Sequence, residues 1–470
     1  MPAILQEVPE SRPEICSDEV IPYMTNIREI ILESLYTIET ENVMSHMLIR
    51  NVSDKYDYLP ARDKAFFKRV TEGTISAKIT LDYVINLYSR KSVDKMKPMI
   101  RCILRMSVYQ LLFMDKVPDN AICDEAVKLC NAKSRPELSG FVNAILRKIA
   151  SDKTGWRDKL EGEEHITKLS VLYSVPEHLV RMIVKEQKNP ESLLKSLSEI
   201  RPTTVRITDS GNESEIVERW TKEGISFRQL VFPKGTYEIS DFEGMNMLPG
   251  FAEGQIIVQD RSSMLAALAL GVKPGEDCLV ADVCAAPGGK TTHIATLLNN
   301  SGRVMSRDIS EEKTSKIVEN VERLGLKNVE VSVHDATVPD ESLIGKCDYV
   351  LADVPCSGLG VMGRKSDIRF HVTNEMMMSL CELQKKIVDT VVSYVKPGGV
   401  FVYSTCTIHK AENEKMVKYI LNNHPFEGLS LRECFDDFDE YAHESDFYIQ
   451  FRPDVNNTDG FFVARFRRIE

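Results

Sequence analysis

Two segments decide how this chain folds: Val350-Leu-Ala-Asp-Val-Pro-Cys-Ser-Gly358 and Phe401-Val-Tyr-Ser-Thr-Cys-Thr-Ile-His409. Each is an apolar run that ends abruptly in small and polar residues. This pattern is typical of a buried parallel strand whose carboxyl end opens into a site. Cys356 and Cys406 are therefore predicted just past the ends of two strands, at the edge where open α/β sheets bind ligands.

The chain around these segments alternates strands and helices from about residue 256 to its end. Strands are predicted at residues 277–283, 302–306, 329–333, 347–352 and 399–404, and helices at residues 290–298, 311–324 and 374–395. The alternation indicates a doubly wound α/β domain, residues 256–470, whose sheet is mostly parallel. Residues 460–467 are expected to add an antiparallel strand.

The chain before residue 256 predicts a tail and three further regions. Residues 1–20 are expected to be a short N-terminal tail. Residues 21–151 have helical spacing of apolar residues throughout, which predicts an all-α bundle with residues 99–113 as its central helix. Residues 152–200 are expected to be a helical connector with one or two helices. Residues 201–255 mix short strands with one amphipathic helix, as in a small α+β module, so the protein is expected to be multidomain.

The composition indicates a globular protein that does not span a membrane. Of the 470 residues, 43% are hydrophobic and 27% are charged. No apolar run approaches the roughly 20 residues needed to cross a bilayer. The 11 cysteines are scattered, without a C-x-x-C pair, zinc spacing or an export signal. We therefore expect a cytoplasmic protein with reduced thiols and no metal.

Charge is distributed unevenly along the chain. A net charge of −11 argues against a nucleic-acid partner when taken alone, but residues 88–148 hold 12 Lys/Arg against 6 Asp/Glu. A basic face on the bundle would suit RNA, whereas a merely solvated helix surface would have the same composition. The charge pattern leaves both interpretations open.

A second informative stretch, Asp282-Val-Cys-Ala-Ala-Pro-Gly-Gly-Lys290, follows a predicted strand and opens a predicted helix. Its Pro-Gly-Gly turn lets the backbone approach a ligand at the positive end of that helix. The turn matches neither the GxGxxG nor the P-loop pattern, but it suits the carboxylate and amine of a sulfonium donor such as S-adenosylmethionine. Asp308 ends the next strand and can accept both hydroxyls of a ribose. Asp335 ends the third strand and can meet an adenine amino group; surface-loop aspartates are the alternative.

Two thiols at neighbouring strand ends suit chemistry on a pyrimidine. C5 of cytosine is a poor nucleophile, but a thiolate that adds to C6 makes C5 enamine-like and able to attack an electrophilic methyl group. Such a thiol must lie near its anionic form. Asp353 can supply an acid near N3 of the base, and a second cysteine fits the release step. The alternative for each cysteine is a small buried hydrophobe.

Five segments resemble the motifs of the RNA cytosine-5 methyltransferase family of the nucleolar-protein/Sun type. They are Val258-Gln-Asp-Arg-Ser-Ser-Met264, Asp282–Lys290, Asp353-Val-Pro-Cys-Ser-Gly-Leu-Gly360, Tyr403-Ser-Thr-Cys-Thr407 with Glu412-Asn-Glu414, and Thr458-Asp-Gly-Phe-Phe462. The resemblance implies a Rossmann-like class I methyltransferase domain. It also implies that Cys406 is the nucleophile and that Cys356 assists product release.

The same resemblance implies the residues that bind S-adenosylmethionine and RNA. The cofactor site would contain Cys284, Ala285, Ala286, Pro287, Gly288, Gly289, Lys290, Asp308, Asp335 and Asp353. Lys313 stands where relatives often have Arg, and Ser366 where they usually have Pro, so the role of each is open. Arg364, Lys365 and Arg369 remain good partners for RNA phosphates.

The predicted bundle resembles the RNA-binding, NusB-like antitermination domain found at the N-terminus of Sun-type enzymes. The resemblance rests on residues 63–73, 104–113, 118–126 and 141–147. The alternative is a scaffold without RNA contact.

The combined hypothesis is a monomeric, cytoplasmic enzyme that methylates C5 of a cytosine in small-subunit ribosomal RNA. DNA cytosine methyltransferases lack the Thr-Cys cysteine, so Tyr403-Ser-Thr-Cys406 favours RNA, and the target base must be unpaired or flipped out. The main alternative is a non-catalytic RNA-binding or ribosome-assembly factor on the same scaffold. A nucleotide-dependent oxidoreductase would need a dinucleotide fingerprint that this chain lacks.

Overall fold

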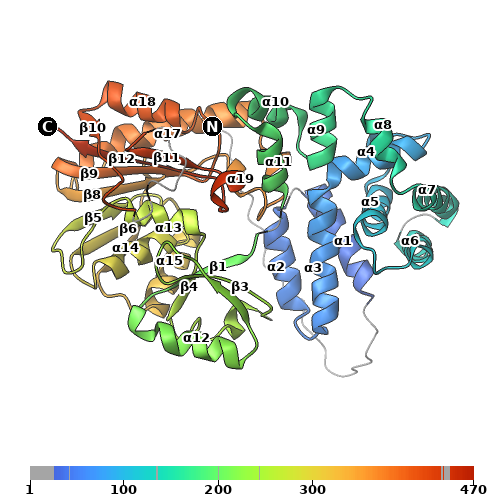
Figure 1. Cartoon of the computed structure of the whole chain (residues 1–470), viewed down its shortest axis with the longest axis horizontal. Helices are drawn as coiled ribbons and strands as arrows, with labels where there is room; N and C mark the ends of the chain where they lie inside the picture. Colours follow the sequence, from blue (N-terminus) through green and yellow to red (C-terminus); the bar gives the residue numbers. More distant parts are fainter. Residues whose placement is uncertain are drawn as a thin grey trace.

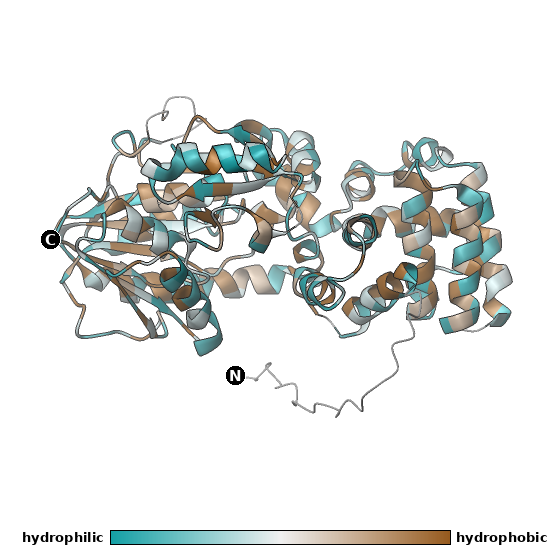
Figure 2. Cartoon of the chain, turned by 90° about the horizontal axis from the view of Figure 1, so that it is seen from below, coloured by the Kyte–Doolittle hydropathy of each residue, from teal (hydrophilic) through white to brown (hydrophobic). Residues whose placement is uncertain are grey.

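The structure is a computed structural model that describes residues 26–41, 43–133, 136–199, 201–242, 244–435, 438 and 445–470. Two lobes lie side by side, a helical bundle and an α/β domain, and a small sheet module lies beside the α/β domain (Figure 1). The helices of both lobes turn apolar residues inward and polar residues outward (Figure 2). The predicted multidomain architecture is confirmed. The predicted tail at residues 1–20 lies outside the described residues.

The bundle is helical as predicted. It contains α1 (Ile27–Glu41), α2 (Ser45–Lys55), α3 (Ala61–Ser76), α4 (Lys78–Tyr88), α5 (Pro98–Phe113), α6 (Asp119–Lys133) and α7 (Ser139–Ser151). Their apolar side chains recur at helical spacing and converge on one core. The central helix is α5, whose residues 102–111 are all buried. It buries even Arg105, because Asp82 and Glu39 accept from its guanidinium at 2.6 and 2.9 Å.

The connector differs from the prediction of one or two helices. Within residues 152–199 the structure has α8 (Gly155–Leu160), α9 (His165–Tyr173), α10 (Glu177–Glu186) and α11 (Pro190–Ser198). These helices are short, and Ser174, between α9 and α10, has a left-handed φ of 52°, so no long periodic run marks them in the sequence. Leu179 and Leu194 pack with Leu359 and Met377 of the α/β domain. The connector is therefore part of the contact between the two lobes.

The small module is a four-stranded antiparallel sheet with one helix, as the α+β prediction required. It contains β1 (Thr203–Ile207), α12 (Glu213–Lys222), β2 (Ser226–Gln229), β3 (Thr236–Ser240) and β4 (Ile256–Val258), in the order β2-β3-β1-β4. Trp220 of α12 is fully buried against the sheet and donates to the Pro249 carbonyl at 3.0 Å. β4 was predicted to open the next domain, but it pairs with β1 and so belongs to this sheet.

The α/β domain is built on an eight-stranded sheet in the order β10-β12-β9-β8-β5-β6-β7, with β11 beside β12. The strands are β5 (Leu279–Asp282), β6 (Arg303–Asp308), β7 (Val329–Val333), β8 (Cys347–Asp353), β9 (Val395–Thr405), β10 (Phe426–Gly428), β11 (Tyr448–Phe451) and β12 (Phe461–Arg468). β5 to β9 pair in parallel, and β12 runs antiparallel to β9, as predicted. The short β10 and β11 were not predicted.

Helices cover both faces of this sheet. α13 (Arg261–Leu268) and α14 (Gly289–Leu297) lie on one face, and α17 (Asn374–Val391) and α18 (Glu414–Asn423) lie on the other (Figure 1). Successive strand residues alternate between these layers: Leu351 packs toward α13 and α14, and Val350 toward α17 and α18. Burial on both faces explains the continuous apolar runs that identified the strands. α15 (Glu311–Arg323) packs on β6 and β7.

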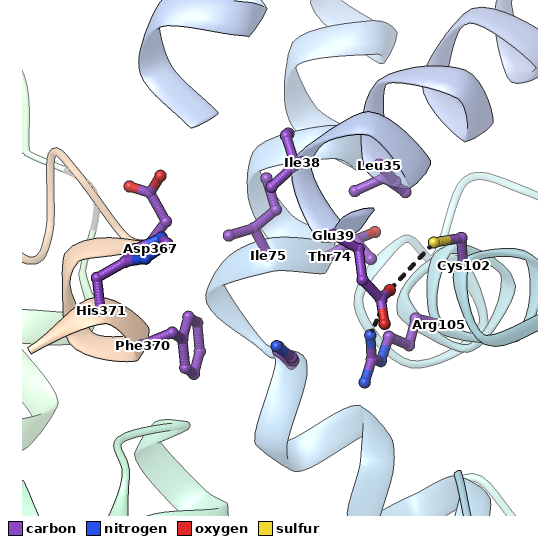
Figure 3. Close-up of a pocket in the computed structure, with 11 residues that line it drawn as sticks. Leu35, Ile38, Glu39, Thr74, Ile75, Cys102, Arg105, Asp367, Phe370 and His371 are labelled. Atoms are coloured by element: carbon purple, nitrogen blue, oxygen red, sulfur yellow. Dashed lines mark hydrogen bonds and ion pairs between the residues drawn. The ribbon is translucent and has the colours of Figure 1, made fainter. Parts of the chain in front are cut away.

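The bundle meets the α/β domain around α16 (Ile368–His371). The Asp367 carboxylate accepts from the backbone N–H of Ser45 at 2.5 Å and so caps α2 from the other domain. Beside this contact lies a cavity of about 170 Å³ (Figure 3), with Phe370 facing the bundle. No helix in the described part of the chain is long and apolar enough to cross a membrane.

Candidate active site

Cys356 and Cys406 lie side by side just beyond the carboxyl ends of β8 and β9. The two strands are parallel neighbours with Asp353 opposite Ser404, so the segments that follow them leave the sheet at the same edge. The two Sγ atoms are 3.3 Å apart, and both thiols are free. The structure thus brings together two cysteines that are 50 residues apart in the sequence.

The two thiols have opposite electrostatic environments. The two sulfurs are within hydrogen-bonding distance of each other, and this hydrogen bond lowers the pKa of Cys406. Lys290 and Lys365 also lower the Cys406 pKa, against burial and Asp353. The same hydrogen bond, together with burial, raises the pKa of Cys356. A single proton shared by the two thiols is therefore favoured on Cys356, and a negative charge is favoured on Cys406.

Asp353, the last residue of β8, is held by two donors. Its carboxylate accepts from Lys290 Nζ at 2.5 Å and from Ser404 Oγ at 2.8 Å. Lys290 was predicted only as part of the cofactor loop, yet its ammonium reaches the cysteine site and lies 5.4 Å from the Phe461 ring. Burial lowers the pKa of Lys290, but the charge of Asp353 raises it overall. A buried ammonium–carboxylate pair is therefore available beside the thiolate.

The glycine turn between β5 and α14 closes tightly on its neighbours. Gly288 has a φ of 101°, and a Cβ there would lie 3.2 Å from Cα of Ile317 in α15, so only glycine fits without strain. Cys284, at the start of the turn, is partly buried. Burial raises the pKa of its thiol, so this thiol is uncharged at neutral pH. The turn leads directly into the N-terminus of α14, where backbone N–H groups favour an anionic ligand group.

Asp308 stands where a cofactor ribose was predicted to bind. Its carboxylate accepts from the backbone N–H groups of Ala286 at 2.9 Å and Ile309 at 2.8 Å, so the cofactor turn itself orients it. Lys313 lies 3.1 Å from the same carboxylate and is half exposed, which gives this lysine a role in holding Asp308. Asp335 accepts from the N–H and hydroxyl of Thr337 at 2.9 and 2.8 Å at the end of β7.

Asp282 was noted as a strand-end carboxylate but was not among the predicted site residues. It is fully buried at the end of β5, and Thr291 donates to one of its oxygens at 2.6 Å. The other oxygen, Oδ1, has no hydrogen-bond partner among the described residues. Burial raises its pKa to about 7. An orphaned acceptor between the glycine turn and Asp308 fits the ammonium group of S-adenosylmethionine.

The three predicted RNA contacts have different positions. Lys365 is exposed and lies near enough to Cys406 to lower its pKa. Arg364 is partly exposed but pairs with Asp260 at 2.9 Å and Asp459 at 2.6 Å. Arg369 is 1% exposed and donates to the carbonyls of Tyr173, Ser174 and Met362 at 3.1, 3.4 and 3.2 Å. The predicted phosphate contact by Arg369 is wrong for this structure, because its guanidinium is inside the domain contact.

The loop after Cys356 packs closely against the start of β12. Gly360 donates to the Cys406 carbonyl at 3.0 Å and accepts from the N–H of Gly460 at 2.9 Å. A Cβ on Gly360 would lie 1.9 Å from the Gly460 carbonyl oxygen and 2.8 Å from that of Cys406. The absence of side chains at both glycines allows this approach. It holds the loop after Cys356 against the backbone of Cys406 and Gly460.

No group of three or more His, Cys, Asp or Glu side chains in the described ranges could hold a metal ion. The cavity beside α16 contains neither cysteine, so it is separate from the thiol pair.

Comparison with known proteins gives consistent matches over both lobes. Residues 267–467 match the family model described as 16S rRNA methyltransferase RsmB/F, and residues 25–151 match the NusB family. The chain is 32% identical to the probable ribosomal RNA small subunit methyltransferase B of Bacillus subtilis, over 94% of this chain and 99% of that protein.

Two solved structures are similar to the chain as well. One, the crystal structure of PH0851, has a TM-score of 0.79 and 24% identity over 96% of this chain and 100% of its own, a likeness of fold. The other is a methyltransferase homologue from Pyrococcus horikoshii, with a TM-score of 0.56 and 26% identity over 65% of this chain and 99% of its own.

Proposed function

The chain belongs to the 16S rRNA methyltransferase RsmB/F family, and from this premise we propose that it methylates C5 of one cytosine in small-subunit ribosomal RNA. The observation that carries the proposal is the Cys356–Cys406 pair, with Sγ atoms 3.3 Å apart and the negative charge favoured on Cys406. A thiolate at the end of a sheet suits nucleophilic attack on a base.

The methyl donor is S-adenosylmethionine, and the residues around the glycine turn fit it. Asp308 is oriented to accept the ribose hydroxyls, and the orphaned Oδ1 of Asp282 suits the amine. The backbone of the turn from Pro287 to Gly289 would receive the carboxylate. Asp335 is assigned to the adenine amino group. The donor supplies an electrophilic methyl group on its sulfonium.

The nucleophilic step belongs to Cys406. Its thiolate adds to C6 of the cytosine, and the electrons of the C5=C6 bond move to C5, which takes up the methyl group. Asp353 lies beside the thiolate with Lys290 as its partner. A proton passed from the Lys290 ammonium to the Asp353 carboxylate would let the carboxylic acid donate to N3 of the base, where negative charge gathers after addition.

The release step needs the second cysteine. After methyl transfer, C5 loses its proton to a base, the C5=C6 bond re-forms and Cys406 leaves as a thiolate. Sγ of Cys356 is 3.3 Å from Sγ of Cys406, so a thiol proton on Cys356 would stabilise the charge that returns to the departing sulfur. Loss of Cys356 should therefore trap the enzyme on its RNA.

RNA would reach the site past the exposed Lys365, and the helical bundle would hold a neighbouring part of the substrate. Each chain carries both cysteines and the complete glycine turn, so we propose that a monomer is active. We propose chemistry without a metal, in which the negative charge on the base is neutralised by a proton that Lys290 supplies through Asp353.

The test uses Cys356→Ala protein, S-adenosylmethionine and transcribed small-subunit ribosomal RNA, with Cys356→Ala/Cys406→Ala as the control. A denaturation-resistant protein–RNA adduct that disappears in the control supports both cysteine roles. Methylation by wild type without an adduct from Cys356→Ala would contradict the division of roles. Neither adduct nor methylation, on RNA or on purified small subunits, would favour a non-catalytic assembly factor.

A further inference from the structure

The loop that carries Cys356 is held by two side chains to which the proposed mechanism gives no role. Glu412 lies in the turn that leads from the Cys406 segment to α18, and Gln384 lies on α17. Both are fully buried. Because burial of a carboxylate and an amide is costly unless they are well hydrogen-bonded, their partners indicate what they are for.

Glu412 receives its hydrogen bonds from the residue that follows Cys356. The N–H of Ser357 donates to Oε2 at 2.9 Å, and the hydroxyl of Ser357 donates to Oε1 at 2.5 Å. Gln384 Nε2 donates to the same Oε2 at 2.9 Å and to the carbonyl of Pro355 at 2.9 Å. The residues on either side of Cys356 are thus fixed by one carboxylate–amide pair.

The same carboxylate ties the Cys356 loop to the segment of Cys406. The Ser357 hydroxyl that contacts Glu412 is also 2.7 Å from the hydroxyl of Thr407, the residue after Cys406. The hydroxyl of Tyr403, just upstream in β9, donates to the backbone carbonyl of Glu412 at 2.7 Å. Displacement of Glu412 would therefore change the relative position of the two cysteine loops.

These hydrogen bonds require both side-chain oxygens of residue 412 to be acceptors. The loop presents an N–H and a hydroxyl, and Gln384 presents an amide N–H, so a carboxylate satisfies all three donors. A glutamine at position 412 would turn an NH2 group toward one of them, although its size is the same. The negative charge of Glu412 also raises the pKa of Cys356. Its effect is smaller than those of the Cys406 hydrogen bond and of burial.

We propose that Glu412, braced by Gln384, is a positioning residue that holds Cys356 in register with Cys406 for the release of methylated RNA. This inference rests on the proposed function, because it assigns the grip to the release step. Glu412 touches neither the base nor the methyl donor. It acts through the Pro355–Ser357 segment, where a displacement of about 1 Å can cost on the order of 10²-fold in rate.

The experiment compares Glu412→Gln and Glu412→Asp with wild type, using full-length protein, S-adenosylmethionine and small-subunit ribosomal RNA. Covalent adduct, steady-state kcat and KM for RNA are measured together with the melting temperature. Glu412→Gln is expected to lower kcat about 10–100-fold with little change in KM, and to accumulate the adduct as Cys356→Ala does. Glu412→Asp should recover part of the rate.

Two further variants keep the inference testable. Glu382→Gln changes an exposed carboxylate on α17 that pairs with Lys385 at 2.7 Å, and it should behave as wild type. If Glu412→Gln does not fold, Gln384→Met removes the hydrogen bonds to Pro355 and to Glu412 but keeps the carboxylate, and it should show the same accumulation of adduct.

The outcomes distinguish failure of the positioning role of Glu412 from failure of the proposed function. Adduct from Cys356→Ala but none beyond the wild-type level from folded Glu412→Gln and Gln384→Met would overturn the positioning role and leave the proposed function intact. No adduct from Cys356→Ala, with wild type active, would instead refute the proposed release step itself. Unchanged kcat in Glu412→Gln would also refute the positioning role.

Discussion

Arg369→Met tests whether Arg369 stabilises the contact between the two lobes or binds RNA. The substitution keeps most of the side-chain volume but removes a guanidinium that donates to the carbonyls of Tyr173, Ser174 and Met362. The first two carbonyls belong to the connector and the third to the catalytic loop. The variant therefore cuts three hydrogen bonds at the contact between lobes and leaves three buried carbonyls without this partner.

The size of the effect follows from those contacts. A hydrogen bond to a charged group contributes about 1.5–3 kcal/mol, and distances of 3.1 to 3.4 Å place these three at the weak end. Burial of the guanidinium opposes this gain, since it lowers the pKa of Arg369 to about 10, which still leaves the group protonated at neutral pH. We expect a net loss of about 3 kcal/mol, or about 6–12 °C in melting temperature for a domain of this size.

The assay is thermal unfolding followed by fluorescence, paired with RNA binding at several salt concentrations. Lys365→Ala is the matched control, because Lys365 lies four residues away and is exposed. It should leave the melting temperature unchanged and lower the slope of log affinity against log salt by about one. An unchanged melting temperature for Arg369→Met, with a reduced salt slope, would refute the structural assignment and restore Arg369 as a phosphate contact.

Three other predictions follow from the site. Alkylation of Cys406, followed by peptide mass spectrometry, should become fast at a lower pH than for an ordinary thiol, and Cys356→Ala should move that pH upward because it removes the hydrogen bond that lowers the Cys406 pKa; an unmoved profile would contradict the shared proton. Gly360→Ala should lower stability by about 1–3 kcal/mol through the clash with Gly460, whereas Gly140→Ala, in open space on α7, should be neutral or stabilising in the same melting assay. Asp308→Ala should weaken S-adenosylmethionine binding about 10–100-fold by calorimetry and leave RNA affinity unchanged; equal loss of both would argue for a folding defect.

The fold was predictable wherever burial imposes a simple pattern. β8 and β9 are buried on both faces, so their sequences are continuous apolar runs that end where the site begins. The same holds for α5, whose apolar length identified it as the central helix. β4 was assigned to the wrong unit because three apolar residues carry no information on their partner, which lies about 50 residues earlier in β1.

The candidate site was predictable in its backbone and less so in its side chains. A glycine-rich turn after a strand indicates a ligand site because glycine allows close backbone approach, and aspartates at strand ends indicate one because they lie at the ligand-binding edge of the sheet. The burial of Arg369 and Glu412 has no such local signature, since charged residues are usually exposed; Glu412 was noticed only as part of a family motif, without a role. Their burial depends on carbonyls and hydroxyls contributed by segments far away in the sequence, at Tyr173 for Arg369 and at Ser357 for Glu412.

The proposed division of roles between the two cysteines rests on their surroundings, because the residue type is the same. Asp353 raises the pKa of both thiols, whereas Lys290 and Lys365 lower the pKa of Cys406 and Glu412 raises that of Cys356. The hydrogen bond between the sulfurs acts in the same sense, since it lowers the pKa of Cys406 and raises that of Cys356. Family resemblance alone assigned Cys406 as the nucleophile from the sequence, and the charges around the pair give a separate physical reason for the same assignment. Lys290→Met, which removes one of these charges, should therefore slow adduct formation, whereas a change at Glu412 should slow release.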